Sequence, residues 1–149
     1  MTVYKPQKNI RLKDYDYHTG WFFITNKTDF NRPILIGKTY LLVRREIENI
    51  SQICEGVSLD YAIIVPTHIH CILIFDESVL PLSEVWRRFK ARCTMQAKKE
   101  GFLGKSLWQR NYFEHVIRNE RALDRIRIYI QNNPLKEDLP LDEIYGFNN

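Results

Sequence analysis

The sequence predicts an α+β domain in which helices pack on one mainly antiparallel sheet. Strand and helix patterns follow one another in the order strand, helix, two strands, helix, strand, helix. A tight turn joins the two middle strands, while long connections separate the others, which favours antiparallel neighbours. The 149 residues, 44% of them hydrophobic, suit one domain with a single sizeable core.

The first third of the chain contains one strand pattern and one helix pattern. Residues 21–25 are aromatic or β-branched, which is typical of a strand, and polar turn-forming residues fill 26–33. Between residues 37 and 54, apolar side chains recur at helical spacing with charged ones between them. Gly56 is placed to end that helix.

The most apolar stretch of the chain is broken only by Pro66-Thr67-His68. This break predicts two strands, near 58–65 and 68–75, joined by a tight turn. Both faces of the second strand are apolar after its first residues, as expected for a central strand covered on two sides.

The C-terminal half predicts a helix, a strand and a further helix. Residues 82–99 carry apolar side chains at steps of three and four, which indicates a helix with one buried stripe. Residues 107–117 are rich in aromatic and β-branched side chains and predict a strand. Asn119 is placed to cap a helix that continues until Pro134 ends it.

No repeat, low-complexity tract or linker divides the chain, so we expect a single domain over residues 1–149. Its core covers about residues 10–137, and residues 138–149 form a polar, loosely packed tail. No apolar run approaches the roughly 18 residues of a membrane span. The N-terminus lacks the apolar stretch of a secretory signal. We therefore expect a cytoplasmic protein with no membrane partner.

The charge and cysteine patterns narrow the function classes. A net charge of +4 and a pI near 9.0 permit nucleic-acid binding without requiring it. Cys54, Cys71 and Cys93 are scattered and lack a CxxC pair. This pattern indicates reduced structural thiols and argues against a disulfide framework or a zinc knuckle.

The first candidate for chemistry is the pair His68 and His70, separated by Ile69. Alternate residues of a strand share a face, so the two imidazoles point to the same side and Ile69 points to the other. Their Cα atoms are expected about 6.6 Å apart, which lets both rings reach one metal ion. The simpler alternative is two polar residues at the start of a strand.

The second candidate lies on the last predicted helix. Tyr129 and Asn133 are four residues apart and so share one side of the helix, beside Ile126 and at the edge of its apolar stripe. A phenol there could face the sheet, and the Asn133 amide could offer an oxygen to a metal. The alternative is a tyrosine that packs at the border of the helix with its hydroxyl in water.

The third feature is a concentration of basic and aromatic residues, which is typical of single-stranded nucleic-acid binding. The alternative is an ordinary solvated helix face. The side chains that we predict to contact DNA are Arg87, Arg88, Lys90, Arg92, Trp108, Arg110, Tyr112 and Arg118.

Four segments combine these features in a fixed order along the chain. They are Val65-Pro66-Thr67-His68-Ile69-His70, Leu107-Trp108-Gln109-Arg110-Asn111-Tyr112-Phe113, Val116-Ile117-Arg118-Asn119-Glu120 and Tyr129-Ile130-Gln131-Asn132-Asn133-Pro134. In order and separation they resemble the single-tyrosine HUH transposases, most of all the branch associated with repetitive extragenic palindromes. The family often has Met-Pro-Asn before the first histidine, where this chain has Val-Pro-Thr.

This resemblance implies a ferredoxin-like sheet with helices and a Mg²⁺ or Mn²⁺ ion held by His68, His70 and Asn133. It also implies that Tyr129 is the catalytic nucleophile. The implied activity is that of a transposase: a metal-dependent, single-stranded DNA endonuclease and strand transferase with a 5′-phosphotyrosine intermediate. The implied partner is single-stranded or hairpin DNA from palindromic repeats. A homodimer that exchanges the tyrosine helix and a monomer remain alternatives.

Three other interpretations are compatible with these residues. A zinc site could join His115 to His68 and His70, although the acid/base groups that usually accompany catalytic zinc are not recognisable. A catalytically silent protein could keep the fold and regulate DNA repeats by binding them. A replication-initiator or relaxase domain would use the same chemistry, but such proteins usually carry further domains.

Overall fold

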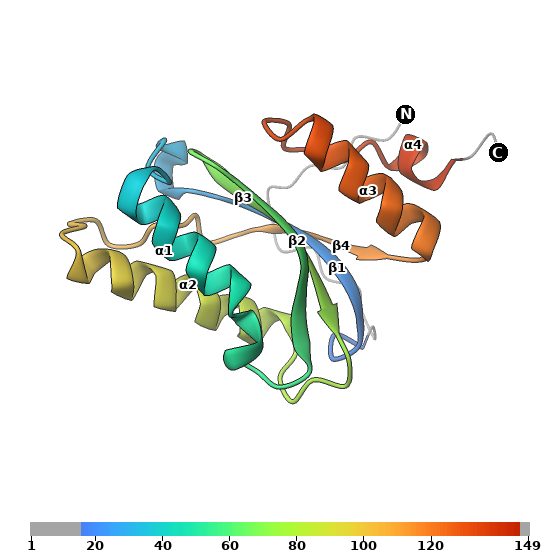
Figure 1. Cartoon of the computed structure of the whole chain (residues 1–149), viewed down its shortest axis with the longest axis horizontal. Coiled ribbons are helices and arrows are strands. Elements are labelled where there is room, and N and C mark those ends of the chain that lie inside the picture. Colours follow the sequence, from blue (N-terminus) through green and yellow to red (C-terminus); the bar gives the residue numbers. More distant parts are fainter. Residues whose placement is uncertain (1–15, 147–149) are drawn as a thin grey trace.

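A four-stranded antiparallel sheet forms the middle layer of the protein, in a computed structural model that describes residues 16–146 (Figure 1). The strands are β1 (Gly20–Lys27), β2 (Val57–Val65), β3 (His68–Phe75) and β4 (Phe113–Ile117). Their order in the sheet is β2-β3-β1-β4, so each helical connection skips one strand. This is the interleaved arrangement of ferredoxin-like folds, and it confirms the predicted α+β class.

Helices cover both faces of the sheet. On one face lie α1 (Gly37–Glu48) and α2 (Leu82–Lys99), and on the other lie α3 (Glu120–Asn132) and α4 (Leu141–Tyr145) (Figure 1). Two 3₁₀ turns, η1 (Asp29–Asn31) and η2 (Ile50–Gln52), follow β1 and α1.

The two faces bury separate apolar clusters because side chains alternate along each strand. Phe22 and Ile24 of β1 belong to the cluster under α1 and α2, whereas Phe23 belongs to the cluster under α3. On β3, Ile69 faces the first cluster and Ile72 faces the second. The prediction of a central strand covered on both sides is therefore confirmed, and Ile69 is fully buried as expected.

Two predicted elements are shorter in the structure than the sequence pattern suggested. The helix expected over 37–54 ends at Glu48, because the Asn49 side chain donates to the carbonyl of Arg45 and closes the last turn. The strand expected over 107–117 begins only at Phe113. Before it, Trp108 forms an isolated antiparallel bridge with Thr28. Lys90 donates to the carbonyl oxygens of the next two residues, Gln109 and Arg110.

The expectation of a loosely packed tail is wrong for its described part. Leu139 and Ile144 are buried, and α4 packs against α3. The apolar residues of this segment are few and widely spaced, so the sequence shows no helical or strand pattern there. They nevertheless belong to the apolar cluster on the α3 face. Residues 10–15 of the predicted core and 147–149 of the predicted tail lie outside the described residues.

Cys54, Cys71 and Cys93 are buried and form no disulfide, as the sequence predicted. Burial raises the pKa of the Cys93 thiol well above its usual value, so this thiol is neutral at physiological pH. Among the described residues, no helix has the length and apolar character needed to cross a membrane.

Candidate active site

His68 and His70 lie together at the start of β3, directly after the β2–β3 turn. Both side chains are almost fully buried on the face of the sheet that α3 covers. Their Nε2 atoms are 3.2 Å apart, so the two rings converge on one point. The structure thus confirms that the two imidazoles share one face of a strand.

Two threonine hydroxyls orient these rings. Thr25 lies opposite His70 in the β1–β3 register, and its hydroxyl oxygen is 2.8 Å from His70 Nδ1. The Thr67 hydroxyl is 3.0 Å from Nδ1 of His68. Because both Nδ1 atoms have partners, both Nε2 atoms are directed at the shared point. Neither threonine was predicted from the sequence: Thr67 could have been found as the neighbour of His68, but only the strand register reveals Thr25.

The segment after α3 brings oxygen atoms to the same point. The carbonyl oxygen of Pro134 is 3.1 Å from His68 Nε2, and that of Lys136 is 2.6 Å from His70 Nε2. An ion pair of 2.9 Å between Lys27 and Glu137 holds this segment against β1. The segment that follows α3 therefore lies over the histidine pair.

This donor set fits a divalent cation. Two ligand atoms that are each about 2.1 Å from an ion, with an angle of about 90° at the ion, lie about 3.0 Å from each other. This is close to the 3.2 Å between the two Nε2 atoms. Burial lowers the pKa of His68. Burial also lowers the pKa of His70, to about 3, and the neighbouring His68 ring adds a smaller effect in the same direction. Both rings are therefore neutral at pH 7, which is the form that binds metals.

Helix α3 carries the predicted nucleophile and is firmly attached to the sheet. Asn119 caps it by accepting from the Ala122 N–H at 2.8 Å, as predicted. Arg127 donates to both carboxylate oxygens of Asp60 on β2, at 2.9 and 2.5 Å. Because Asp60 is nearly buried, this bidentate pair fixes both the rotation and the position of the helix.

Tyr129 is half-buried at the edge of the apolar stripe, where the sequence placed it. Asn133 is beside it, and its amide nitrogen donates to the Tyr129 carbonyl oxygen at 3.1 Å. Both residues border a cavity of about 300 Å³ between α3 and the α4 segment. Burial raises the pKa of the Tyr129 phenol, and the carboxylates of Glu143 and Asp138 raise it further.

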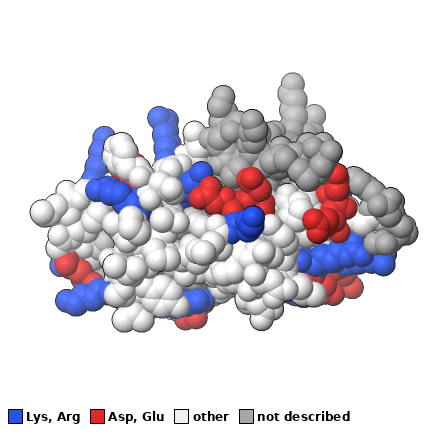
Figure 2. Space-filling model, turned by 90° about the horizontal axis from the view of Figure 1, so that it is seen from above, with Lys and Arg blue, Asp and Glu red and all other residues white. Residues whose placement is uncertain are grey.

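The α3–α4 face is seen from above in Figure 2. Asp and Glu side chains gather near its middle and toward one side, with Lys and Arg side chains around them. Charges of both signs are therefore mixed on this face, whereas the charged side chains that line the cavities beside α2 are all basic.

The other two histidines take no part in the pair. Nε2 of His115 is 2.6 Å from the Tyr145 hydroxyl, so His115 ties β4 to α4. Within residues 16–146, no group of three or more His, Cys, Asp or Glu side chains is placed to hold an ion. The alternative zinc site of His68, His70 and His115 is therefore wrong.

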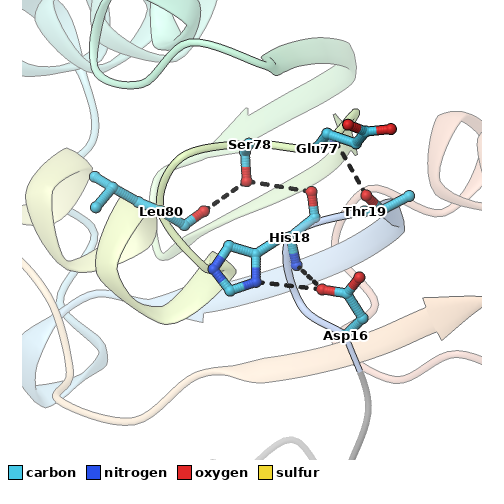
Figure 3. Close-up of polar contacts among 6 residues, drawn as sticks. All are labelled: Asp16, His18, Thr19, Glu77, Ser78 and Leu80. Carbon is cyan, nitrogen blue, oxygen red and sulfur yellow. Dashed lines mark hydrogen bonds and ion pairs between the residues drawn. The ribbon is translucent and has the colours of Figure 1, made fainter.

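His18 lies in a separate polar cluster that joins the start of β1 to the loop after β3 (Figure 3). Its Nδ1 is 3.2 Å from an Asp16 carboxylate oxygen. The Ser78 hydroxyl donates to the backbone carbonyl oxygens of His18 and Leu80, and the Glu77 N–H donates to the Thr19 hydroxyl. This cluster anchors a loop.

The structure brings five of the predicted DNA contacts together beside α2. Arg87, Lys90, Arg110, Trp108 and Tyr112 all line one cavity of about 470 Å³. The two aromatic side chains are only 2% and 5% exposed, however, so they form the floor of this cavity. Their rings pack against the α2 aromatics, so little of either ring is open to a stacking base.

The remaining predicted DNA contacts are dispersed. Arg88 is bound by Glu84 at 2.8 Å, and Arg92 joins α2 to α1 through the buried Glu46, also at 2.8 Å. Arg118 lies on the other side of the sheet, with its guanidinium 4.3 Å from the centre of the α4 tyrosine ring. These three residues do not border the cavities beside α2.

Comparison with known proteins connects this geometry to a family. The family model described as "Transposase IS200 like" matches residues 14–133. An uncharacterized protein from Haemophilus influenzae is 34% identical over an alignment that covers 87% of this chain and 88% of that protein. The REP-associated tyrosine transposase of Escherichia coli is 28% identical over 116 residues, covering 78% of this chain and 66% of that protein.

Solved structures show the same fold. The structure of a REP-associated tyrosine transposase bound to a REP hairpin has a TM-score of 0.69 at 25% identity, covering 85% of this chain and 73% of that one. A crystal structure of a Deinococcus radiodurans protein assigned as a transposase has a TM-score of 0.54 at 16% identity, covering 83% and 96% of the two chains, and supports the fold alone. With four-fifths of its residues inside the family match, the chain belongs to the IS200-like transposases.

Proposed function

We propose that this protein is a single-tyrosine transposase that cuts and joins single-stranded DNA with the help of Mg²⁺ or Mn²⁺. The observation that carries the proposal is the buried pair of neutral imidazoles, whose Nε2 atoms converge beneath the segment that directly follows the helix bearing Tyr129. Family membership, and a relative named as a tyrosine transposase, support the same chemistry.

In this proposal His68 and His70 hold the ion, and Tyr129 is the nucleophile. The Asn133 amide, which donates to the Tyr129 carbonyl oxygen in the structure, would turn toward the ion as a third ligand. A bound divalent ion would polarise the scissile phosphate and stabilise the departing oxygen. The Tyr129 oxygen attacks phosphorus as it loses its proton, the bond to the 3′ oxygen breaks, and that oxygen takes up a proton. The products are a 5′-phosphotyrosine and a free 3′-hydroxyl, and the reverse reaction joins strands without ATP.

The raised pKa of Tyr129 lowers the fraction of this phenol that is ionised and able to attack. An ordinary phenol has a pKa near 10, so only about one in a thousand is ionised at pH 7. Burial and the nearby carboxylates of Asp138 and Glu143 make the phenolate rarer still. Polarisation of the phosphate by the bound ion would therefore have to compensate for the weak nucleophile that the neutral Tyr129 phenol presents.

We further propose that DNA binds along α2. Two adjoining cavities of about 660 and 470 Å³ share Lys90 and Ser106 and run between α2 and the loop before β4. Their lining contains six cationic side chains and no carboxylate, which suits a polyanion. The cationic residues are Arg87, Lys90, Lys98, Lys99, Lys105 and Arg110. The hairpin bound to the solved relative supports hairpin DNA as the ligand.

The decisive test is covalent capture of DNA. Incubating the protein with a hairpin that has single-stranded flanks, in Mn²⁺, is expected to yield a protein–DNA adduct on a denaturing gel. Tyr129→Phe removes the attacking oxygen and is expected to abolish the adduct while hairpin affinity stays unchanged. Tyr61→Phe is the matched control, because Tyr61 packs on the same face of the sheet and should leave the adduct intact.

Two results would count against the proposal. An adduct formed by the Tyr129→Phe protein would show that another residue is the nucleophile. Tight, specific hairpin binding by the unmodified protein with no adduct in either Mg²⁺ or Mn²⁺ would instead identify a catalytically silent repeat-binding protein.

A further inference from the structure

Phe30 holds an exposed ring in an unfavourable backbone conformation. It lies in η1 with φ 57° and ψ 21°, and Asn31 follows with φ 54°, so two successive residues that are not glycine adopt the left-handed region. Side chains with a Cβ disfavour this region. The Phe30 ring is 81% exposed, so burial of the ring does not compensate for the strain. Strain of this kind is concentrated at functional sites.

The turn that displays Phe30 is rigid and is attached beside the histidine pair. Within the turn, the Thr28 hydroxyl donates to the Arg32 carbonyl oxygen at 2.6 Å. The Thr28 N–H donates to the Thr67 carbonyl oxygen at 2.9 Å, and the Leu35 N–H donates to that of Pro66 at 3.0 Å. The turn is therefore bonded to the two residues that immediately precede His68.

The side chain of Arg32 gives the exposed ring a charged neighbour. Its guanidinium carbon is 5.6 Å from the centre of the Phe30 ring. Its Nε donates to the Asp29 backbone carbonyl oxygen at 3.3 Å, and its only ion-pair contact within the described part of the chain is a weak one to the Asp29 carboxylate at 4.0 Å. The guanidinium is therefore kept beside the turn with most of its charge uncompensated. An exposed aromatic face next to a cation is the combination that stacks a nucleobase and neutralises its phosphate.

We propose that Phe30 and Arg32 form a stacking site for one unpaired base of the DNA strand that enters the candidate active site. This inference rests on the proposed function and adds a binding position outside the cavities along α2. An unpaired base is the ligand that suits an exposed aromatic ring, because its own face is free to stack on the ring. In a paired stem the bases stack on one another, and the phosphates on the outside need no aromatic partner. A second copy of this chain is the other conceivable occupant, and the experiment includes it as an outcome.

The experiment combines protein variants with base deletions in the DNA. The affinity of the protein is measured by fluorescence anisotropy for a labelled hairpin with single-stranded flanks and for the blunt hairpin. Phe30→Ala is expected to weaken binding of the flanked hairpin by roughly 5- to 150-fold, the effect of one stacked base, and to leave the blunt hairpin unaffected. Phe30→Trp is expected to retain the affinity.

Abasic substitution along the flank then identifies the stacked base. At one position, loss of the base is expected to weaken binding by the wild-type protein but not by Phe30→Ala, because the two changes remove the same contact. Leu103→Ala is the matched control, since Leu103 is 97% exposed and apolar but not aromatic.

Phe30→Gly is expected to melt no lower than wild type, because glycine adopts the left-handed region without strain.

The outcomes separate this inference from the proposed function. If the wild-type protein captures flanked hairpins covalently but Phe30→Ala binds them equally well, the stacking site is refuted and the transposase proposal stands. If Phe30→Ala instead converts a wild-type dimer to a monomer in sedimentation, the ring is a contact between protein copies and the inference is also refuted. A wild-type protein that neither binds nor cuts DNA overturns both proposals.

Discussion

At the scale of single residues, the hydroxyls of Thr25 and Thr67 are the least expected part of the candidate site. A hydroxyl group both donates and accepts, so it can pair with either tautomer of an imidazole. A carbonyl oxygen beside Nε2 requires a proton on Nε2, whereas a metal requires a bare Nε2 and a proton on Nδ1. The threonines satisfy Nδ1 in both cases and keep each ring in one orientation.

Thr25→Val is therefore expected to lower Mn²⁺ affinity by about 10- to 100-fold, as loss of an outer partner of a metal-binding histidine typically does. Thr25→Ser keeps the hydroxyl and is expected to restore the affinity. Calorimetric titration of the DNA-free protein with Mn²⁺ measures both without relying on cleavage. Equal Mn²⁺ affinity in Thr25→Val and wild type would show that Thr25 does not position His70.

At the scale of elements, α2 and the loop before β4 act as one unit. Lys90 donates to the carbonyl oxygens of Gln109 and Arg110 at 2.8 and 3.0 Å, which secures the loop along the helix. Burial lowers the pKa of this ammonium group to about 8, so it remains mostly protonated at neutral pH. We therefore interpret Lys90 mainly as the residue that holds the loop against α2 and so shapes the DNA-binding cavities. Direct contact with a DNA phosphate is a lesser role for it.

The cations at the outer end of this unit are expected to contact DNA directly. Lys105→Gln is expected to weaken hairpin binding at low salt and to reduce the slope of log affinity against log salt by roughly 1, the change for one lost phosphate contact. Arg45→Gln on the exposed side of α1 removes the same charge outside the cavities and is the control. Equal slopes for the two variants, measured by anisotropy across a salt series, would contradict a specific DNA path along α2.

At the scale of the whole molecule, burial on the α3 face keeps three histidines neutral. His68 and His70 lie under the segment that follows α3, and His115 lies between β4 and α4. Burial, and then the nearby Arg118, lower the pKa of His115 from 6.5 to about 4. The unfolded chain therefore binds protons in a pH range where the folded protein does not, which couples the stability of the whole fold to pH.

This coupling predicts a loss of stability in mild acid. Between pH 6.5 and 4 the unfolded chain carries the extra proton of His115, so stability rises with pH and falls as pH decreases. The contribution of His115 is about 1–2 kcal/mol between pH 7 and pH 5. Urea unfolding at these pH values is expected to show the loss, and His115→Gln is expected to reduce it by that amount. An unchanged pH dependence in the variant would show that His115 is not the group that titrates.

The sequence by itself determined the features that depend on local periodicity. Alternation along a strand placed His68 and His70 on one face, and helical spacing placed Tyr129 and Asn133 side by side. The Asn119 cap and the break at Pro66-Thr67 are likewise local signals, and the structure confirms them. These features need no knowledge of distant contacts, because each depends on the geometry of a single element.

Only the tertiary structure decided which segments meet. The pairing of Thr25 with His70 follows from the β1–β3 register, and a shift of one residue would place Thr25 on the other face of the sheet. Residues distant in the sequence position the loop before β4: Asp29 donates its N–H to the Leu107 carbonyl oxygen, and Lys90 binds the two carbonyl oxygens that follow Trp108. The carbonyl oxygens of Pro134 and Lys136 reach the histidines because the chain after α3 lies over the start of β3, where the Lys27–Glu137 ion pair holds it. Such contacts arise from burial and hydrogen bonding between distant residues, which local patterns do not encode.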